Sequence, residues 1–264
     1  MSNKHSAAVI SEKLSGGSAA LIGYLPVGFP SVDESIHVAE VMIENGVDII
    51  ELGFPYSDPA MDGPVIQRAT TSALETGTHL EDLLRAVSEL SQYAPILSMT
   101  YWNPIHWYGV DRFAKDFAQA GGAGLITPDL PPEEAAEWIT ASDKHNLERV
   151  FLAAPSSSPG RLGLIAGAAK GWVYAASTMG VTGQRRDVDT RTEGLVSRIR
   201  AAGAPLVCVG LGVSDGDQAH AIASYADGVI VGSAFIKPLL EESASVALGQ
   251  IEALAKDLKA GCKR

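Results

Sequence analysis

Three acidic residues lie close together in the sequence, and two of them could carry proton-transfer chemistry. Glu51 lies near the end of the apolar run 48–52, and Asp58 and Asp62 follow in a loop rich in proline and glycine. Removal from water raises the pKa of a carboxyl group, which can then both donate and accept a proton near neutral pH. Two carboxyl groups of different exposure can divide the work, one exchanging protons while the other stays ionised. The pattern indicates an acid–base pair of Glu51 and Asp62, although structural ion pairing and ordinary turn formation are alternative roles.

Three glycine-containing segments indicate a place for a phosphate group. They are Gly180-Val-Thr-Gly183, Gly210-Leu-Gly212 and Gly232-Ser233, and they follow the last three strand-like runs. Glycine lets backbone N–H groups approach an anion closely, and the N-terminus of a helix adds partial positive charge. Each segment alone could be a tight turn, but together they favour an anion site. Arg185 and Arg186 could bind the anion as well or lie on the surface.

The elements that position these residues repeat along the chain. Short, continuously apolar runs are expected to be parallel strands buried on both faces, and amphipathic stretches between them are expected to be helices. The strand-like runs are 19–25, 48–52, 96–100, 124–127, 150–153, 172–176, 206–209 and 228–231. The clearest helical stretches are Val32–Glu44, Leu80–Leu90, 133–145, 193–202 and 215–225. Eight strand–helix units in 264 residues predict a (β/α)8 barrel, with an open doubly wound sheet as the alternative.

Two connections are longer than the others, and both follow strands. The first begins at Gly53 after the second strand, and the second runs from Thr178 to Arg191 after the sixth. Long loops in compact domains usually bind, catalyse or close over a ligand, and barrel enzymes place their active sites at the C-terminal ends of the strands. The sequence thus predicts one barrel domain over residues 1–264, with an extra N-terminal helix and long loops after strands 2 and 6.

Composition excludes several classes of function. The net charge is −11, so nucleic acid and anionic membranes are unsuitable partners. Two cysteines and scattered histidines predict neither a disulfide framework nor a metal site, and a reducing compartment fits. We find no signal-peptide pattern and no apolar run of the roughly 20 residues that cross a bilayer, so we expect a cytoplasmic protein.

Six motifs of the chain closely resemble those of the tryptophan synthase alpha chain family. The most specific is Glu51-Leu-Gly-Phe-Pro-Tyr-Ser-Asp-Pro-Ala-Met-Asp-Gly-Pro64, which has the family's Glu and Asp at the family's spacing. The others are Met99-Thr-Tyr-Trp-Asn-Pro104, Pro128-Asp-Leu-Pro-Pro-Glu-Glu134, Ala154-Pro-Ser-Ser-Ser-Pro159, Gly180-Val-Thr-Gly183 and Val231-Gly-Ser233. The resemblance extends from about Gly23 to Lys237.

The resemblance implies the retro-aldol cleavage of indole-3-glycerol phosphate to indole and glyceraldehyde 3-phosphate. In that reaction, Glu51 would act as the acid–base residue, and Asp62 would accept a hydrogen bond from the indole N–H. The implied substrate-binding residues are Tyr174, Thr182, Gly183, Gly212, Gly232 and Ser233. The reaction requires no metal or cofactor on this chain.

The resemblance also implies a partner, a beta subunit that carries pyridoxal phosphate and receives indole within an α-β-β-α heterotetramer. The residues implied to contact it are Asp58, Asn103, Pro104, Asp129 and Pro131. The chain departs from the family pattern at Pro26, Phe29 and Met61, which bear on pocket shape and partner fit, but every catalytic group is retained.

Two other functions fit parts of the pattern. One is a different phosphate-binding barrel enzyme, such as a sugar-phosphate isomerase or indole-glycerol phosphate synthase, which would also need an acid–base pair and a phosphate site. The other is a non-catalytic subunit that only activates a partner. The loop that joins Glu51 to Asp62 argues against the first, and the presence of both acids argues against the second.

Overall fold

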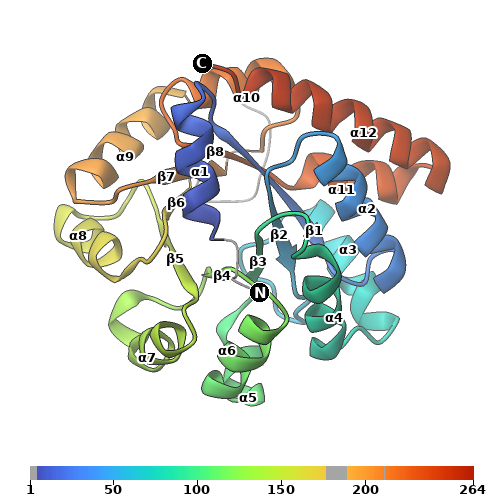
Figure 1. Cartoon of the computed structure of the whole chain (residues 1–264), viewed down its shortest axis with the longest axis horizontal. Coiled ribbons are helices and arrows are strands. Elements are labelled where there is room, and N and C mark those ends of the chain that lie inside the picture. Colours follow the sequence, from blue (N-terminus) through green and yellow to red (C-terminus); the bar gives the residue numbers. More distant parts are fainter. Residues whose placement is uncertain (1–4, 177–188, 211) are drawn as a thin grey trace.

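The computed structural model describes residues 5–176, 189–210 and 212–264. Eight parallel strands close into a barrel in which each strand pairs with its neighbours in sequence and β8 pairs with β1 (Figure 1). The strands are β1 (Ala20–Pro26), β2 (Ile49–Gly53), β3 (Ile96–Met99), β4 (Gly124–Thr127), β5 (Glu148–Ala153), β6 (Val173–Ala176), β7 (Val207–Gly210) and β8 (Gly228–Val231). The predicted (β/α)8 barrel is therefore confirmed, and the open sheet is excluded.

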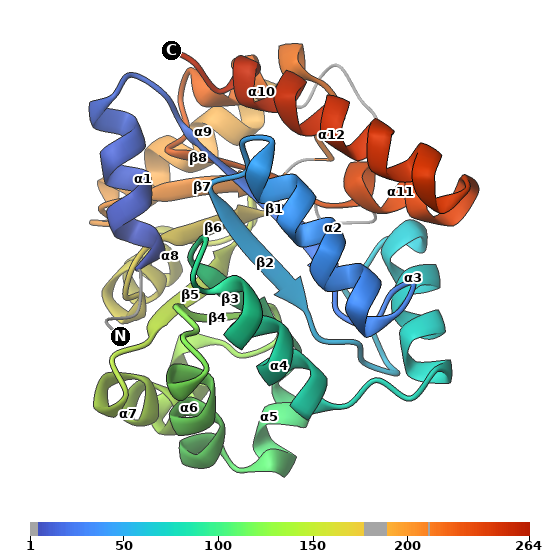
Figure 2. The ribbon, with the colours of Figure 1, turned by 45° about the vertical axis from the view of Figure 1, so that its right-hand side comes forward.

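Helices surround the barrel on its outside (Figure 2), except for α1, which lies across its N-terminal end. They are α1 (Ser6–Ser15), α2 (Val32–Glu44), α3 (Pro64–Glu75), α4 (Leu80–Leu90), α5 (Trp102–Tyr108), α6 (Val110–Gln119), α7 (Ala136–Lys144), α8 (Pro159–Ala168), α9 (Asp189–Ala201), α10 (Gly216–Ala223), α11 (Ser233–Glu241) and α12 (Ala244–Gly261). A short 3-10 turn, η1 (Pro132–Glu134), precedes α7. No helix in the described ranges is long and apolar enough to cross a membrane.

Several helices begin where the sequence supplies an N-cap. The side chains of Ser31, Ser158 and Asp215 accept a hydrogen bond from the backbone N–H three residues later, at the starts of α2, α8 and α10. Such a cap satisfies an N–H group that has no partner within the helix. Pro64 and Pro159 occupy the first helical position, where a missing N–H costs nothing.

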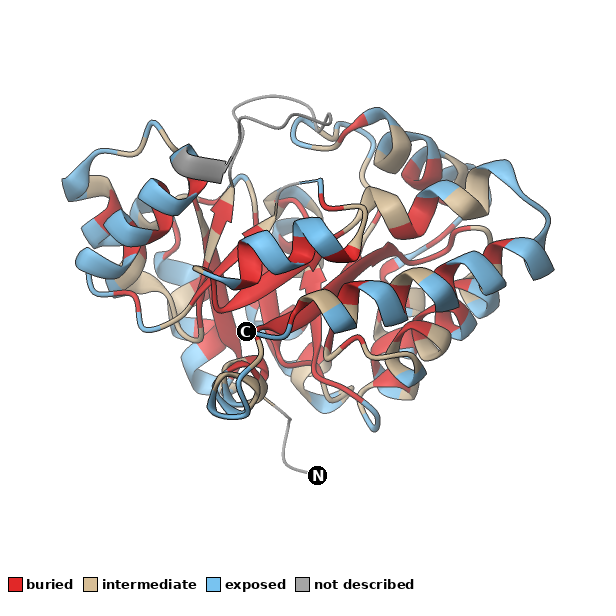
Figure 3. Ribbon diagram, turned by 90° about the horizontal axis from the view of Figure 1, so that it is seen from above, coloured by how far each residue is buried: buried red, intermediate tan, exposed pale blue. Residues whose placement is uncertain are grey.

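Side chains on alternate strand positions form two cores. One set points outward and packs beneath the helices, and Figure 3 shows the resulting layer of buried residues along the strands. The other set fills the barrel and includes Ile22, Ile49, Leu97, Val150 and Cys208, all of which are at most 1% exposed. Such an interior is packed solid and leaves the C-terminal ends of the strands as the place for a site.

Helix α1 joins the inner core at the N-terminal end of the barrel. Ile10 packs with the interior side chains, and buried Glu148, the first residue of β5, caps the helix. The Glu148 carboxylate accepts hydrogen bonds from the Ser6 N–H (2.9 Å), the Ser6 hydroxyl (2.5 Å) and the Ala7 N–H (2.9 Å). Trp172 donates to the same hydroxyl at 2.9 Å. The extra N-terminal helix is confirmed.

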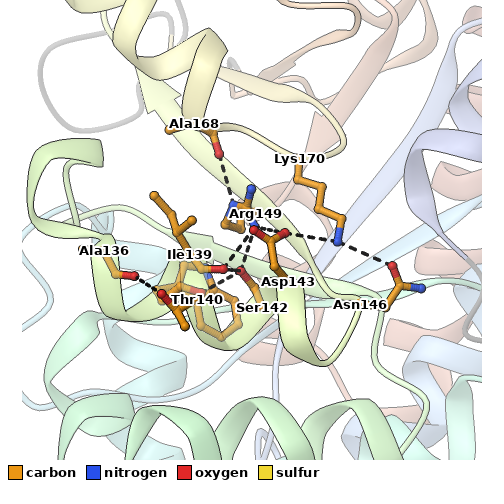
Figure 4. A network of polar contacts seen from close by, with 10 residues as sticks. Ala136, Ile139, Thr140, Ser142, Asp143, Asn146, Arg149, Ala168 and Lys170 are labelled. Carbon is orange, nitrogen blue, oxygen red and sulfur yellow. Dashed lines mark hydrogen bonds and ion pairs between the residues drawn. The ribbon is translucent and has the colours of Figure 1, made fainter.

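A second polar network at this end ties two helices to β5. Arg149 donates to Asp143 (2.6 Å), to the Ser142 hydroxyl (2.9 Å) and to the Ala168 carbonyl (3.1 Å), as Figure 4 shows. The Arg149 side chain is only 9% exposed, and its donors are shared between the ends of α7 and α8. The network therefore fixes the ends of these helices against the barrel.

Element boundaries differ from the predictions at several places. The predicted helix 133–145 is divided into η1 and α7, because Ala135 leaves the helical conformation between them. Strand β2 begins after Asp48, whose carboxylate instead accepts a hydrogen bond from the Leu21 N–H at 2.9 Å. Strand β5 begins at Glu148, two residues earlier than predicted, and the buried Glu148 carboxylate accepts hydrogen bonds from the N-terminus of α1.

Candidate active site

Glu51 lies on β2, deep in the mouth of the barrel. Its neighbours in register are Tyr24 on β1 and Leu97 on β3, and the residue is 1% exposed. Its Oε2 atom is buried without a hydrogen-bond partner in the described part of the chain. Burial, and then the nearby charge of Asp62, raise the pKa of Glu51 to about 8. The predicted position and desolvation of this carboxyl group are thus present, and it can exchange a proton near neutral pH.

Asp62 reaches the same region from the loop between β2 and α3. The loop is held by the Met61 N–H, which donates to the Tyr101 hydroxyl at 2.8 Å, and by Gln67, which donates to the Asp62 carbonyl at 2.9 Å. Burial raises the pKa of Asp62 to about 6. Asp62 is therefore ionised at a pH at which Glu51 is still protonated, as expected for two acids that divide their roles.

Tyr174 forms another wall of the site. It lies on β6, and its ring stacks on Trp172 with a centroid distance of 6.0 Å. A Cβ atom at Gly210 would lie 2.1 Å from the Tyr174 hydroxyl oxygen, so glycine is needed there to make room. Burial and the charge of Glu51 raise the pKa of Tyr174 well above its usual value, which keeps the phenol neutral.

The glycine segments after β7 and β8 lie where the fold commonly binds phosphate. Gly232 directly follows β8 and caps α11, which begins at Ser233, and Gly212 follows β7 with a φ of +63° that favours glycine. The N-terminus of α11 presents N–H groups and partial positive charge to an anion. Thr182 and Gly183, with Arg185 and Arg186, lie outside the described residues.

The predicted partner-contact residues lie after three consecutive strands. Asp58 follows β2, Asn103 and Pro104 lie on α5 after β3, and Asp129 and Pro131 follow β4. Asp58, Asn103 and Asp129 are exposed. The Asp129 carboxylate accepts hydrogen bonds from the Trp102 N–H at 2.9 and 3.1 Å, which joins the loop after β4 to the start of α5.

A cavity of about 250 Å³ opens beside these residues at the ends of β4 and β5. Its lining includes Thr127, Asp129, Pro131, Leu152 and Arg161. Arg161 forms an ion pair with Glu133 of η1. The described residues contain no group of three or more His, Cys, Asp and Glu side chains placed to hold a metal ion.

Sequence reasoning missed Tyr24 and Tyr101, which both contribute to this site. Each belongs to the electrostatic environment of Asp62, and both are 6% exposed. Strand alternation could have identified Tyr24, since Ala20, Ile22 and Tyr24 share the inward face of β1. Tyr101 follows β3 as the N-cap of α5, a position with no periodic signal.

The fold and the site together place the chain among enzymes of the (β/α)8-barrel class. Two acids with separated pKa values lie at the C-terminal mouth of the barrel, next to a glycine-lined helix N-terminus. Comparison with known proteins then identifies the family. Residues 10–263 match the family model described as tryptophan synthase alpha chain.

Individual relatives agree with the family model. The tryptophan synthase alpha chain of Leifsonia xyli subsp. xyli is 54% identical over 246 residues, which are 92% of this chain and 94% of that protein. That of Thermobifida fusca is 52% identical over 260 residues, 96% of each chain. A chain of Mycobacterium tuberculosis tryptophan synthase superposes with a TM-score of 0.92 at 49% identity, covering 98% of this chain and 99% of that one. The chain belongs to the tryptophan synthase alpha chain family, and the resemblance found in its motifs is confirmed.

Proposed function

We propose that Glu51 and Asp62 carry out the retro-aldol cleavage of indole-3-glycerol phosphate to indole and glyceraldehyde 3-phosphate. Membership of the family makes the chain a lyase of tryptophan biosynthesis. The observation that carries the assignment of roles is the unpartnered Oε2 of Glu51, on a carboxyl group whose pKa is raised to about 8. A protonated carboxyl group at this position can donate its proton at neutral pH and then act as a base.

The reaction divides into two proton transfers. Protonated Glu51 gives its proton to C3 of the indole ring, and positive charge develops on the ring nitrogen. The Asp62 carboxylate, ionised above a pH of about 6, accepts the N–H hydrogen bond and stabilises that charge. Ionised Glu51 then takes the proton of the side-chain hydroxyl, the carbon–carbon bond breaks, its electron pair returns to the ring, and the aldehyde forms.

The substrate's phosphate is proposed to bind at the opposite end of the site. Gly232 and Ser233 at the α11 N-terminus and Gly212 after β7 would supply backbone N–H groups, and Thr182 and Gly183 would complete the site from the segment after β6. Tyr174 would form a wall for the indole ring beside Glu51. Fixing both ends of the substrate places C3 against the acid, and such positioning is a large part of catalysis.

A beta subunit that carries pyridoxal phosphate is the proposed partner, within an α-β-β-α heterotetramer in the cytoplasm. The surface that fits this role is formed by the segments that follow β2, β3 and β4, which contain Asp58, Asn103, Pro104, Asp129 and Pro131. Since Asp58 lies in the same loop as Asp62, contact with a partner would act directly on the loop that carries the acid. We therefore propose that the isolated chain is a slow enzyme that the beta subunit accelerates.

The test is the release of indole from indole-3-glycerol phosphate by the purified chain, with and without a beta subunit. We expect indole from the chain alone and a higher turnover number with the partner. No indole under either condition would refute the proposed reaction. Equal turnover with and without the partner would refute only the proposed activation.

A further inference from the structure

Tyr24 is a polar residue in the site that the proposed mechanism does not use. It lies on the inward face of β1, directly beside Glu51 in the strand register, and it is 6% exposed. Among the residues that the structure describes, Glu51 Oε2 is a fully buried oxygen without a hydrogen-bond partner, and Glu51 pairs with Tyr24 in the strand register. Buried polar groups normally find partners, so this arrangement indicates function.

Two glycines, one at the end of β2 and one directly after β8, lie next to the Tyr24 ring. A Cβ atom at Gly53, at the end of β2, would lie 2.2 Å from the Tyr24 hydroxyl oxygen. A Cβ atom at Gly232, after β8, would lie 3.5 Å from Cδ1 on the same ring. The ring therefore lies between Gly232, in the proposed phosphate site, and Gly53, at the strand end that leads into the Asp62 loop.

The surroundings of the hydroxyl keep it a neutral donor. Burial raises the pKa of Tyr24 well above 10, and the negative charges of Asp62 and Glu51 raise it further. The other titratable groups that face Tyr24 are the phenols of Tyr101, after β3, and Tyr174, on β6. Cys208 on β7 interacts with Glu51, and its own pKa is raised well above the usual value by burial. None of these groups is a cation. The Tyr24 hydroxyl is therefore a donor that can stabilise the ionised form of Asp62.

We propose that Tyr24 is a positioning residue that donates a hydrogen bond from its hydroxyl to the Asp62 carboxylate in the substrate complex. The inference rests on the proposed function, in which Asp62 accepts the indole N–H. A carboxylate held from one side by Tyr24 would present its other oxygen to the substrate. The same hydrogen bond favours the ionised form of Asp62, because it exists at full strength only with the charged acceptor.

The test is the variant Tyr24→Phe, which removes one oxygen atom and leaves the ring. We expect kcat to fall about tenfold, the loss of one hydrogen bond to a charged group, while KM stays within about twofold. The acidic limb of the kcat/KM profile is expected to move up by about half a pH unit or more, since Asp62 loses a group that favours its ionisation. The matched control is Tyr93→Phe, at a residue that is 54% exposed on the surface. This variant should leave both kcat and the acidic limb unchanged.

A double variant separates positioning from a general loss of structure. If Tyr24 acts through Asp62, adding Tyr24→Phe to Asp62→Asn should lower kcat by less than twofold, whereas independent effects would multiply. An unchanged kcat and acidic limb in Tyr24→Phe, or a full tenfold further loss in the double variant, would overturn the inference while the wild type still released indole. A wild type that releases no indole would overturn the proposed function itself, and this inference with it.

Discussion

The two ends of the barrel differ in how their acidic residues are paired. At the N-terminal end, Asp48, Glu148 and Asp227 are buried or nearly so, and each is fully paired. Asp48 binds the Leu21 N–H and Lys259 (2.6 Å), and Asp227 binds the Val207 N–H (2.8 Å) and Arg200 (2.7 Å). At the C-terminal end, Glu51 has an unpartnered oxygen within the described structure, and Asp62 has a raised pKa.

This difference separates stability from catalysis within one chain. A paired carboxylate at the N-terminal end holds strands and helices together through its hydrogen bonds and ion pairs. An unpaired one at the C-terminal end costs stability, because burial opposes its ionisation, but it can move a proton near neutral pH. Substitutions at one end should therefore change stability or catalysis without changing the other.

The largest effect is expected from Glu51→Gln. Glutamine fills the same space but cannot exchange a proton, so we expect kcat for indole release to fall by about a thousandfold or more. The steady-state rate at saturating indole-3-glycerol phosphate checks this. Activity within tenfold of the wild type would assign the acid–base role to another group.

The second effect is a loss of stability from Glu148→Ala. The change removes three hydrogen bonds to one carboxylate and the cap of α1, so we expect unfolding to become easier by about 3 kcal/mol. The free energy of unfolding in urea checks this, and Glu12→Ala, an exposed position on the same helix, is the control. Below the unfolding transition, kcat should remain within about twofold of the wild type. A kcat that falls as far as in Glu51→Gln would contradict the separation of the two ends.

The third effect is a gain of stability in Glu51→Gln that depends on pH. The folded-state pKa of Glu51, about 8, lies above its unfolded value of about 4.5, so the wild type loses stability as the pH rises from 4.5 to 8. Glutamine has no such loss. We expect the stability of the variant relative to the wild type to rise with pH, by up to about 4 kcal/mol between pH 5 and pH 8.5, because one pKa unit corresponds to about 1.4 kcal/mol. Thermal unfolding of both proteins at the two pH values checks this. A difference in stability between variant and wild type that does not vary with pH would contradict the prediction.

The smallest effect concerns the pH dependence of the wild type. Turnover requires ionised Asp62 and protonated Glu51, whose pKa values are about 6 and about 8. We expect a bell-shaped dependence of kcat/KM on pH, with its maximum between these two pKa values and a tenfold fall per pH unit on either side. A profile that is flat from pH 5 to 9 would show that these two groups do not control the reaction.

Most of the fold could be predicted from sequence because it depends on local patterns. Continuous apolar runs located all eight strands within about two residues, and Val32–Glu44 and Leu80–Leu90 were predicted at their observed bounds. The capping of α1 by Glu148 could not be predicted, since the partners are 142 residues apart in sequence. The break between η1 and α7 likewise follows from the backbone at Ala135, which carries no turn signal.

Only the part of the site that depends on local sequence patterns could be predicted. Glu51 is positioned by its own strand, so its burial followed from the apolar run around it. The places of Tyr24 and Tyr101 depend on contacts between strands, which no local pattern reveals. The roles of the partner-contact residues and of the phosphate-binding glycines stay predictions.

The most direct test of the separation between the two ends is the pKa of Glu51 itself. It can be measured by titrating the protein labelled with 13C at the glutamate carboxyl groups, with Glu51→Gln identifying the signal. Our account expects a carboxyl group that titrates near pH 8 and is missing from the variant. A Glu51 signal that titrates near the ordinary value of 4.5 would contradict the account, because a carboxylate ionised at neutral pH could not supply the proton on which the reaction depends.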